Sequence, residues 1–310
     1  MAFQRFLDPQ FIAALNDLYG QGSWWTKLAD SPDVFLAIRN NYLNAYSRGM
    51  SIGKISWNSG RISLQVHEEY LTKSTDDQYR DLLDENPSRS RPVVSSSQEY
   101  IATLPRIKNR ARLFAGEERG GTNRVAYNVF TVLDMEAAFD AKQEETETEP
   151  KPENETKIKA YRGRMDLVVL GPNLQLTIFE AKLYSNGDLR ARGTPKVCGQ
   201  LREYNAFLVK HGTELEAAYH TVLSCFSQLS GNFFQTRRSH PRAKKILDGR
   251  TPLTIDPLPR LLVFGYDTLQ QGGVSKDIKR IEEEVHIGGF GPQHIRTVRR
   301  VTAINERDLQ

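Results

Sequence analysis

The chain has 310 residues, of which 39% are hydrophobic and 26% are charged, and its formal net charge at pH 7 is +4. This length accommodates one large domain or two ordinary ones, and the composition is that of a soluble globular protein. Only two cysteines are present, Cys198 and Cys225, which excludes a disulfide framework, a cysteine-based zinc site and a four-cysteine iron–sulfur cluster. The N-terminus lacks the apolar core of a signal peptide and no run reaches membrane-spanning length, so we expect a cytoplasmic protein without a membrane partner.

Residues 1–95 are predicted to form an accessory domain of mostly short strands. An amphipathic helix over residues 9–19 comes first. Turn residues at hairpin spacing then separate four strand-like segments, which are Val34–Arg39, Tyr42–Ser47, Ile52–Trp57 and Ile62–His67. A helix that starts at Ser31-Pro32-Asp33 is the alternative for this region. Residues 84–97 are rich in serine and proline and are typical of a linker.

Five aromatic residues of this accessory domain allow two interpretations. Aromatic side chains can stack on nucleic-acid bases. In a small β-domain, however, such residues are more often part of the core. The residues are Trp24, Trp25, Tyr42, Tyr46 and Trp57.

Residues 96–310 are predicted to form a second domain of the α/β class. The expected elements are helices over 98–113, with an interruption at Pro105, and over 117–127, a strand over 128–139, a hairpin over 164–182, helices over 196–210 and 214–234, a strand over 261–266, a helix over 275–286 and an exposed strand over 295–304. Six glutamates occur among residues 144–155, so a mobile acidic loop is expected over 142–157.

The segment from residue 164 to residue 182 has the clearest local pattern in the chain. Two runs rich in Val, Ile, Leu and Phe flank the turn residues Gly171-Pro172-Asn173, which predicts a β-hairpin. We expect Leu170 to pair with Leu174. This pairing determines which side chains of the two strands are neighbours.

In that register three charged residues share one face of the hairpin. Asp166 lies opposite Ile178, and Glu180 is its diagonal neighbour, roughly 7–8 Å away between backbone positions. Because residues two apart point to the same side of a strand, Lys182 shares the face of Glu180. Two carboxylates this close repel each other, and burial adds to the cost unless a cation lies between them.

Oxygen ligands from carboxylates, a backbone carbonyl and water are the ligands that Mg²⁺ and Mn²⁺ prefer. Lys182, one step further along the face, would point at whatever that metal binds. The pattern therefore predicts a metal site with a positioned lysine. The plainer interpretation is that Asp166 begins a strand and that Glu180 and Lys182 are surface charges at its end.

The C-terminal part of the chain is basic. From residue 183 onward it contains nineteen Lys and Arg residues against thirteen Asp and Glu residues. Clusters of this kind suit a polyanion, although a solvated face is the plainer interpretation of any one cluster. The predicted nucleic-acid contacts are Arg190, Arg192, Lys196, Arg237, Arg238, Lys244 and Lys245, and a further cluster contains Arg296, Arg299 and Arg300.

The hairpin is followed by a predicted helix on which Gln200 and Tyr204 lie one turn apart. With Arg164-Met165-Asp166 and Phe179-Glu180-Ala181-Lys182, this helix makes the sequence resemble the PD-(D/E)XK nuclease superfamily, in particular its RecB-like branch. Methionine stands where the proline of the family name would be. The resemblance covers residues 98–270 and implies a restriction-endonuclease-like core of helix, three strands, helix and strand, with a mixed central sheet flanked by helices.

The resemblance also implies the ligands of the metal. Asp166, Glu180 and the carbonyl of Ala181 would bind Mg²⁺, with Mn²⁺ as a substitute. Family members often add an acidic residue from the first helix. Glu118 is the candidate here, and Glu117 is the second choice.

Lys182 would position or activate the attacking water, and Gln200 and Tyr204 would orient the site and the nucleic-acid strand. The expected activity is Mg²⁺-dependent hydrolysis of phosphodiester bonds, in DNA rather than RNA because most such folds act on DNA. Bacterial or phage defence and DNA processing are contexts associated with such enzymes, and a homo-oligomer is compatible with the sequence. The alternatives are an inactive nuclease fold that binds nucleic acid or a protein, and a domain that binds proteins only.

Overall fold

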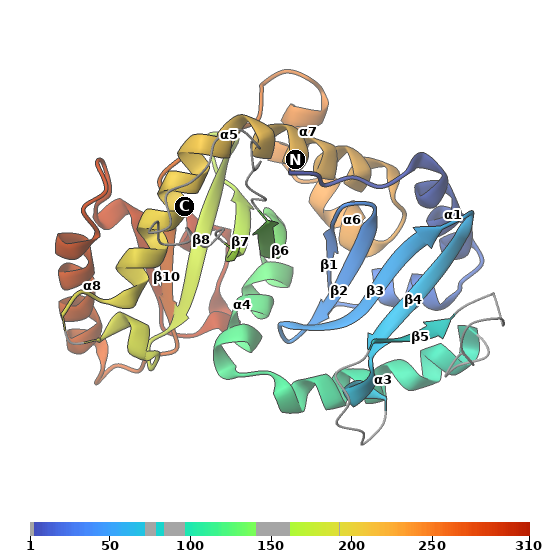
Figure 1. Ribbon diagram of the computed structural model, residues 1–310, viewed down its shortest axis with the longest axis horizontal. Coiled ribbons are helices and arrows are strands. Elements are labelled where there is room, and N and C mark those ends of the chain that lie inside the picture. The colour runs from blue at the N-terminus through green and yellow to red at the C-terminus, as the bar shows by residue number, and fades with distance from the viewer. Residues whose placement is uncertain (1–2, 72–78, 84–96, 141–161, 192) are drawn as a thin grey trace, which may run out of the picture.

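The computed structural model describes residues 3–71, 79–83, 97–140, 162–191 and 193–310. Two β-sheets lie side by side, and helices pack around and between them (Figure 1). The architecture is therefore mixed α/β, as predicted. The predicted acidic loop over 142–157 and most of the predicted linker over 84–97 lie outside the described residues.

The N-terminal sheet is an antiparallel meander. Its strands are β1 (Phe35–Ile38), β2 (Tyr42–Ser47), β3 (Met50–Asn58), β4 (Arg61–His67) and β5 (Tyr79–Leu83), paired in chain order. Arg48 and Gly49 between β2 and β3 both have positive φ, at 54° and 79°. Tight two-residue hairpin turns require this conformation. The four predicted strands are confirmed, whereas β5 was not predicted.

Three helices flank this sheet, namely α1 (Pro9–Gly20), α2 (Trp24–Ala29) and α3 (Ser97–Phe114). The sequence signal at the start of α1 is clear, because the Asp8 side chain accepts a hydrogen bond from the Gln10 amide and Pro9 occupies the first helical position. Pro105 was expected to interrupt the third helix. Instead it lies inside a continuous α3.

The second sheet has the strand order β11-β10-β8-β7-β6, with the short β9 paired to β8. β6, β7 and β8 form an antiparallel meander, while β10 is parallel to β8 and β11 is parallel to β10. The bounds are β6 (Val132–Asp140), β7 (Arg162–Leu170), β8 (Gln175–Leu183), β9 (Thr254–Ile255), β10 (Arg260–Phe264) and β11 (Ile295–Val298). The last strand ends six residues before the predicted limit of 304, where short 3₁₀ turns follow.

The helices around this sheet are α4 (Glu117–Asn128), α5 (Lys196–Gln228), α6 (Asn232–Arg238), α7 (Pro241–Leu247) and α8 (Gln271–Val285). Two separate helices were predicted over 196–210 and 214–234. They are instead one helix, α5, because Leu208, Leu215 and Tyr219 continue the buried stripe past Gly212 at helical spacing. A glycine inside a helix costs about 1 kcal/mol, which the packing of the stripe offsets.

Both sheets share one continuous hydrophobic core, and a smaller cluster lies under α8. On α6, the Phe233 ring lies 5.1 Å from that of Phe35 in β1. α3 packs against the N-terminal elements, with Tyr100 5.6 Å from Trp24. The division of the chain at residues 95 and 96 stays a prediction.

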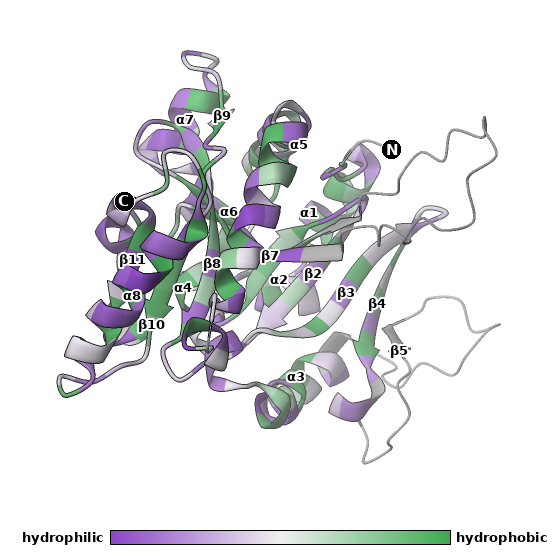
Figure 2. Ribbon diagram, turned by 60° about the vertical axis from the view of Figure 1, so that its left-hand side comes forward, coloured by the Kyte–Doolittle hydropathy of each residue, from purple (hydrophilic) through white to green (hydrophobic). Residues whose placement is uncertain are grey.

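Hydropathy follows this arrangement. Figure 2 shows hydrophobic segments along the strands of both sheets, whereas α8 is largely hydrophilic on the side that faces the viewer. Within the described ranges, no helix combines the length and the apolar character needed to cross a bilayer.

Candidate functional site

The predicted hairpin is present as β7 and β8, but its register differs from the predicted one by two residues. Leu170 pairs with Leu176 rather than with Leu174. The loop is longer than expected because it closes between Gly171 and Gln175, whose carbonyl accepts a hydrogen bond from the Gly171 amide at 2.8 Å. A slip of two residues leaves every side chain on the face predicted for it, since side chains alternate with a period of two.

The slip changes the distance between the two carboxylates along the strands. The pairing continues outward from Leu167 and Phe179. Extended by one residue beyond the paired segment, this register would place Asp166 opposite Glu180 instead of diagonally from it. Directly opposite residues are the closest cross-strand neighbours in a sheet.

Asp166 is partly buried, and its Oδ2 atom accepts a hydrogen bond from the Ala181 amide at 2.7 Å. Burial raises the pKa of Asp166 well above its ordinary value, and the negative charge of Glu180 adds to the effect. Glu136 raises it further, while the Ala181 amide and Lys182 act in the opposite direction. Ionising this pair therefore costs free energy unless a cation is nearby.

Lys182 supplies one positive charge. Its Nζ atom lies 2.8 Å from Glu180 Oε1 and 3.7 Å from Asp188 Oδ2, and its side chain is 8% exposed. Burial lowers the pKa of Lys182, but the charges of Glu180, Glu118 and Asp166 outweigh burial, and the net effect is a raised pKa. Lys182 is therefore protonated at neutral pH.

α5 positions Tyr204 against the site. The Tyr204 hydroxyl lies 2.6 Å from Glu180 Oε2, and it also contacts the backbone carbonyl of Arg164. The hydroxyl thereby ties α5 to both strands of the hairpin. Gln200 lies one turn earlier on the same helix, and its buried Oε1 atom has no hydrogen-bond partner among the described residues.

α4 contributes Glu118 from its first turn. Glu118 Oε2 accepts hydrogen bonds from the Leu183 amide at 2.9 Å and from Asn186 Nδ2 at 2.7 Å. Glu118 therefore adjoins the end of β8 next to Lys182, whereas Glu117 is exposed and makes no such contact.

Two carboxylates and a backbone carbonyl are the ligands that this arrangement offers a metal. Within the described part of the chain, no three His, Cys, Asp or Glu side chains converge as a ligand set. The charge balance nevertheless fits a divalent cation, because the negative charges of Glu180, Glu118 and Asp166 all act on the one ammonium group of Lys182. The Ala181 carbonyl and water would complete a set of oxygen ligands of the kind that Mg²⁺ prefers.

Glu136 of β6 is a neighbour of the site that sequence reasoning missed. Its φ of 51° lies in the left-handed region, which is uncommon for a residue other than glycine and marks local strain. Its carboxylate lies 3.4 Å from Arg164 Nη1 and acts on the pKa of Asp166. The available signal was an acidic residue inside the apolar run from Val132 to Ala138.

Arg237 does not fit its predicted contact with nucleic acid, because it is only 2% exposed. Its guanidinium donates to the carbonyls of Ala126, Val132 and Phe233 and lies 3.7 Å from the centroid of the Phe233 ring. Burial lowers the pKa of Arg237 to about 9. This arginine ties α6 to α4 and β6.

An Arg237→Ala variant is therefore expected to be destabilised by about 3 kcal/mol or more, since three buried carbonyls would lose their donors. Urea denaturation measures the change. Lys245→Ala is the matched control, because Lys245 is an exposed basic residue of the same cluster and its loss should change stability by less than about 0.5 kcal/mol. Equal stability of the two variants would contradict the structural role of Arg237.

The remaining predicted basic residues divide between two places. Arg238 donates to the carbonyls of Ser227 and Leu229, both at 3.0 Å, at the end of α5. Lys244 and Lys245 are exposed on α7, which lies at the start of β8, whereas the candidate site lies toward the end of β8 (Figure 1). Arg190 and Lys196 are exposed and flank the loop that follows β8, while Arg192 lies outside the described residues.

A cleft of about 660 Å³ adjoins the end of β8, and we call it the arginine cleft. Leu183 and Phe264 form part of its wall, and the first turn of α4 forms another part. Five arginines line it, namely Arg48, Arg112, Arg124, Arg299 and Arg300. Two of them belong to a cluster found in the sequence, whereas the other three come from segments far away along the chain.

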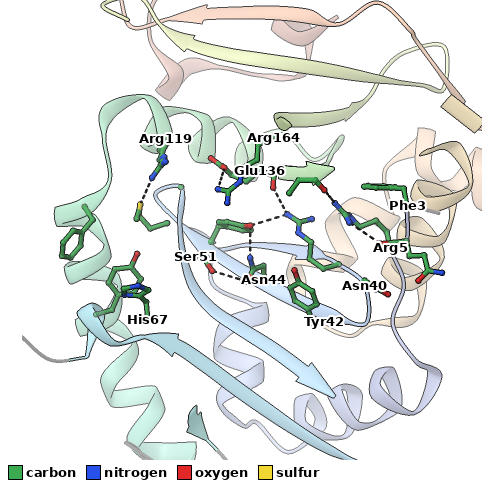
Figure 3. Close-up of a pocket in the computed structure, with 18 of the residues that line it drawn as sticks. Phe3, Arg5, Asn40, Tyr42, Asn44, Ser51, His67, Arg119, Glu136 and Arg164 are labelled. Carbon is green, nitrogen blue, oxygen red and sulfur yellow. Dashed lines mark hydrogen bonds and ion pairs between the residues drawn. The ribbon is translucent and has the colours of Figure 1, made fainter. Parts of the chain in front are cut away.

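A second cleft of about 770 Å³ separates the two sheets, and we call it the inter-sheet cleft. Figure 3 shows Arg119, Glu136 and Arg164 on one side of it and Tyr42, Asn44 and Ser51 on the other. Glu136 and Arg164 place the cleft next to Asp166.

Comparisons of the chain with family models, with curated proteins and with solved structures found no match.

Proposed function

We propose that the protein is a Mg²⁺-dependent nuclease that hydrolyses phosphodiester bonds, with DNA as the expected substrate. The observation that carries this proposal is the convergence of Asp166, Glu180 and Lys182 at one place on β7 and β8. Tyr204 of α5 and Glu118 of α4 adjoin the same place.

The topology supports a restriction-endonuclease-like core. In chain order the elements are α4, the antiparallel meander of β6, β7 and β8, then α5, and then β10 parallel to β8. This is the helix, three strands, helix and strand order that the resemblance implies. The central sheet is mixed, and helices flank it.

Asp166, Glu180 and the carbonyl of Ala181 would hold the metal. A bound divalent cation neutralises phosphate charge and lowers the pKa of a bound water. Lys182, protonated beside the carboxylates, stabilises the negative charge that develops on the phosphate. Its raised pKa argues against a role as general base, which needs a pKa near the working pH.

Two other residues hold the site in place. Tyr204 fixes the orientation of Glu180 through its hydroxyl. Glu118 fixes the end of β8 and Asn186. The arginine cleft lies beside this end of β8 and supplies the positive charge that attracts the phosphate backbone.

The test is incubation of the purified protein with linear duplex, circular duplex and single-stranded DNA, with Mg²⁺ and with a chelator. We expect products only with the metal, and cleavage about a hundredfold slower or more by the Lys182→Ala protein. Cleavage of the circular substrate would indicate endonuclease action. Absence of metal-dependent cleavage of every substrate, by protein that binds DNA, would refute the enzyme and favour an inactive binding module.

One observation favours that second candidate. Both oxygens of Glu180 are engaged by protein groups, Oε1 by Lys182 and Oε2 by Tyr204. A nuclease fold that has lost its metal could keep Glu180 as an internal hydrogen-bond acceptor. Metal titration separates the two candidates, because an inactive module of this kind gives no Mg²⁺-dependent shift in melting temperature.

A further inference from the structure

The floor of the inter-sheet cleft contains two buried arginines that share one carboxylate. Arg39 Nη1 lies 2.5 Å from Asp134 Oδ1, and Arg5 Nε lies 3.4 Å from Asp134 Oδ2. Tyr219 of α5 also donates to Asp134 Oδ2, at 3.0 Å. Two guanidinium groups against one carboxylate leave one positive charge in excess at this floor.

The charged groups of this floor are buried. Arg5 is 7% exposed, Arg39 is 5% exposed and Asp134 is 1% exposed. Among the described residues, Asp134 is the carboxylate that pairs with either arginine, and Glu136 at the rim pairs with Arg164 instead. Both guanidinium groups also donate to backbone carbonyls, Arg39 Nη2 to Met135 at 2.7 Å and Arg5 Nη2 to Ala138 at 3.3 Å, and their two positive charges against one carboxylate favour an anionic ligand at this position.

The wall next to this floor contains a network of polar side chains in which the hydroxyl of Tyr46 is an unused hydrogen-bond donor within the described part of the chain. The hydroxyl of Tyr46 accepts hydrogen bonds from Asn44 Nδ2 at 2.9 Å and from Arg39 Nη2 at 3.4 Å. Ser51 Oγ in turn donates to Asn44 Oδ1 at 3.2 Å (Figure 3). Tyr46 is 7% exposed, and its own hydroxyl proton has no acceptor among the described residues. That proton is therefore available to an acceptor atom of a ligand.

Aromatic surface lies beside the network. The ring of Tyr42 is partly exposed at the cleft, and Lys54 Nζ lies 4.8 Å from its centroid. On the opposite side Arg119 is exposed, and its contact with the Met50 sulfur is long, at 4.0 Å. The cleft thus combines a cationic floor, an aromatic face and hydrogen-bonding amide and hydroxyl groups.

We propose that the inter-sheet cleft binds an unpaired nucleotide of the strand to be cut, with a phosphate at the floor of Arg5 and Arg39 and a base against Tyr42 and Asn44. This inference rests on the proposed nuclease function. A volume of about 770 Å³ is in the range of pockets that enclose small ligands, so single-stranded nucleotides fit, whereas a double helix would have to open first. The N-terminal sheet thereby contributes one wall of the substrate site.

Fluorescence anisotropy with a labelled oligonucleotide, in a chelator so that no cleavage occurs, tests the proposal. We expect the single strand to bind at least tenfold more tightly than the duplex of the same sequence. Tyr42→Ala should weaken single-strand binding about tenfold through lost stacking. Arg119→Ala should reduce the slope of log K against log salt by about 0.7.

Lys279→Ala is the control, because Lys279 is an exposed basic residue on α8, which lies at the opposite end of the molecule from the N-terminal sheet (Figure 1). It should bind as the wild type does. The inference is overturned if duplex and single strand bind equally, if both cleft variants match the control, or if a mononucleotide binds as tightly as the oligonucleotide. Should Tyr42→Ala not fold, the salt slope of Arg119→Ala decides alone.

The nuclease proposal fails separately. Loss of metal-dependent cleavage with intact single-strand binding would refute the enzyme and leave the cleft assignment standing. Cleavage that persists while Tyr42→Ala binds single strands as the wild type does would refute only the cleft assignment.

Discussion

A Lys182→Ala variant is expected to lose cleavage by a factor of about 10²–10³ while its affinity for Mg²⁺ stays within a few-fold of the wild type. The reason is that the carboxylates and the lysine of the site have different proposed roles. Asp166 and Glu180 are the proposed metal ligands, whereas the ammonium group of Lys182 lies 2.8 Å from Glu180 Oε1 and is proposed to act on the phosphate. Single-turnover cleavage and Mg²⁺-dependent thermal shifts measure the two properties.

Lys279→Ala is the matched control, because Lys279 is an exposed lysine of α8 and is not one of the predicted nucleic-acid contacts. It should retain full cleavage. If Lys182→Ala loses metal affinity as completely as Glu180→Ala does, the two residues act as one unit and the separate role of Lys182 is wrong. Full activity of Lys182→Ala would remove the lysine from the mechanism altogether.

An Asp166→Asn variant is expected to be inactive and yet more stable than the wild type without metal at neutral pH. The raised pKa of Asp166 means that the folded protein binds more protons than the unfolded chain between the ordinary value of 3.8 and the folded value. The stability of the metal-free wild type therefore falls as pH rises through that interval. Asparagine removes this cost and keeps an oxygen acceptor for the Ala181 amide.

Thermal unfolding in a chelator tests this expectation, since each 1 kcal/mol gained raises Tm by roughly 2–4 °C. The gain should vanish below about pH 3, where the wild-type carboxyl is protonated in both states. Added Mg²⁺ at a hundred times its Kd should stabilise the wild type by about 2.7 kcal/mol and leave the variant unchanged. A variant less stable than the wild type at pH 7 in the chelator would contradict the assigned strain.

The hairpin illustrates how far local pattern carries a sequence argument. The alternation of side chains along each strand placed Asp166, Glu180 and Lys182 on one face. This prediction holds although the loop length was predicted wrongly, because the resulting register shift is an even number of residues. The pairing itself could not be obtained, because Leu174 adopts a positive φ of 59° that its residue type does not announce. The strand register thus depended on the geometry of the turn. The face on which each side chain lies depended only on whether the register shift was an even or an odd number of residues.

Other features depend on tertiary packing and had no local signal. The basic cluster around Arg237 looked uniform along the sequence, yet one member is buried against three carbonyls while Lys244 and Lys245 face solvent. The inter-sheet cleft joins Arg5, Asn44 and Glu136, which are separated by many residues. The spacing of residues along the sequence carries no information about tertiary contacts of this kind.

Helix α5 spans both regions of the molecule. Tyr204 bonds Glu180 in the candidate site, and Tyr219, fifteen residues later, bonds Asp134 under the cleft floor. At 1.5 Å per residue these two hydroxyl-bearing positions are about 22 Å apart along the axis. α5 therefore fixes the distance between the candidate site and the cleft floor. An insertion of four residues between the two tyrosines would lengthen this distance by about 6 Å, whereas insertions in surface loops would leave it unchanged.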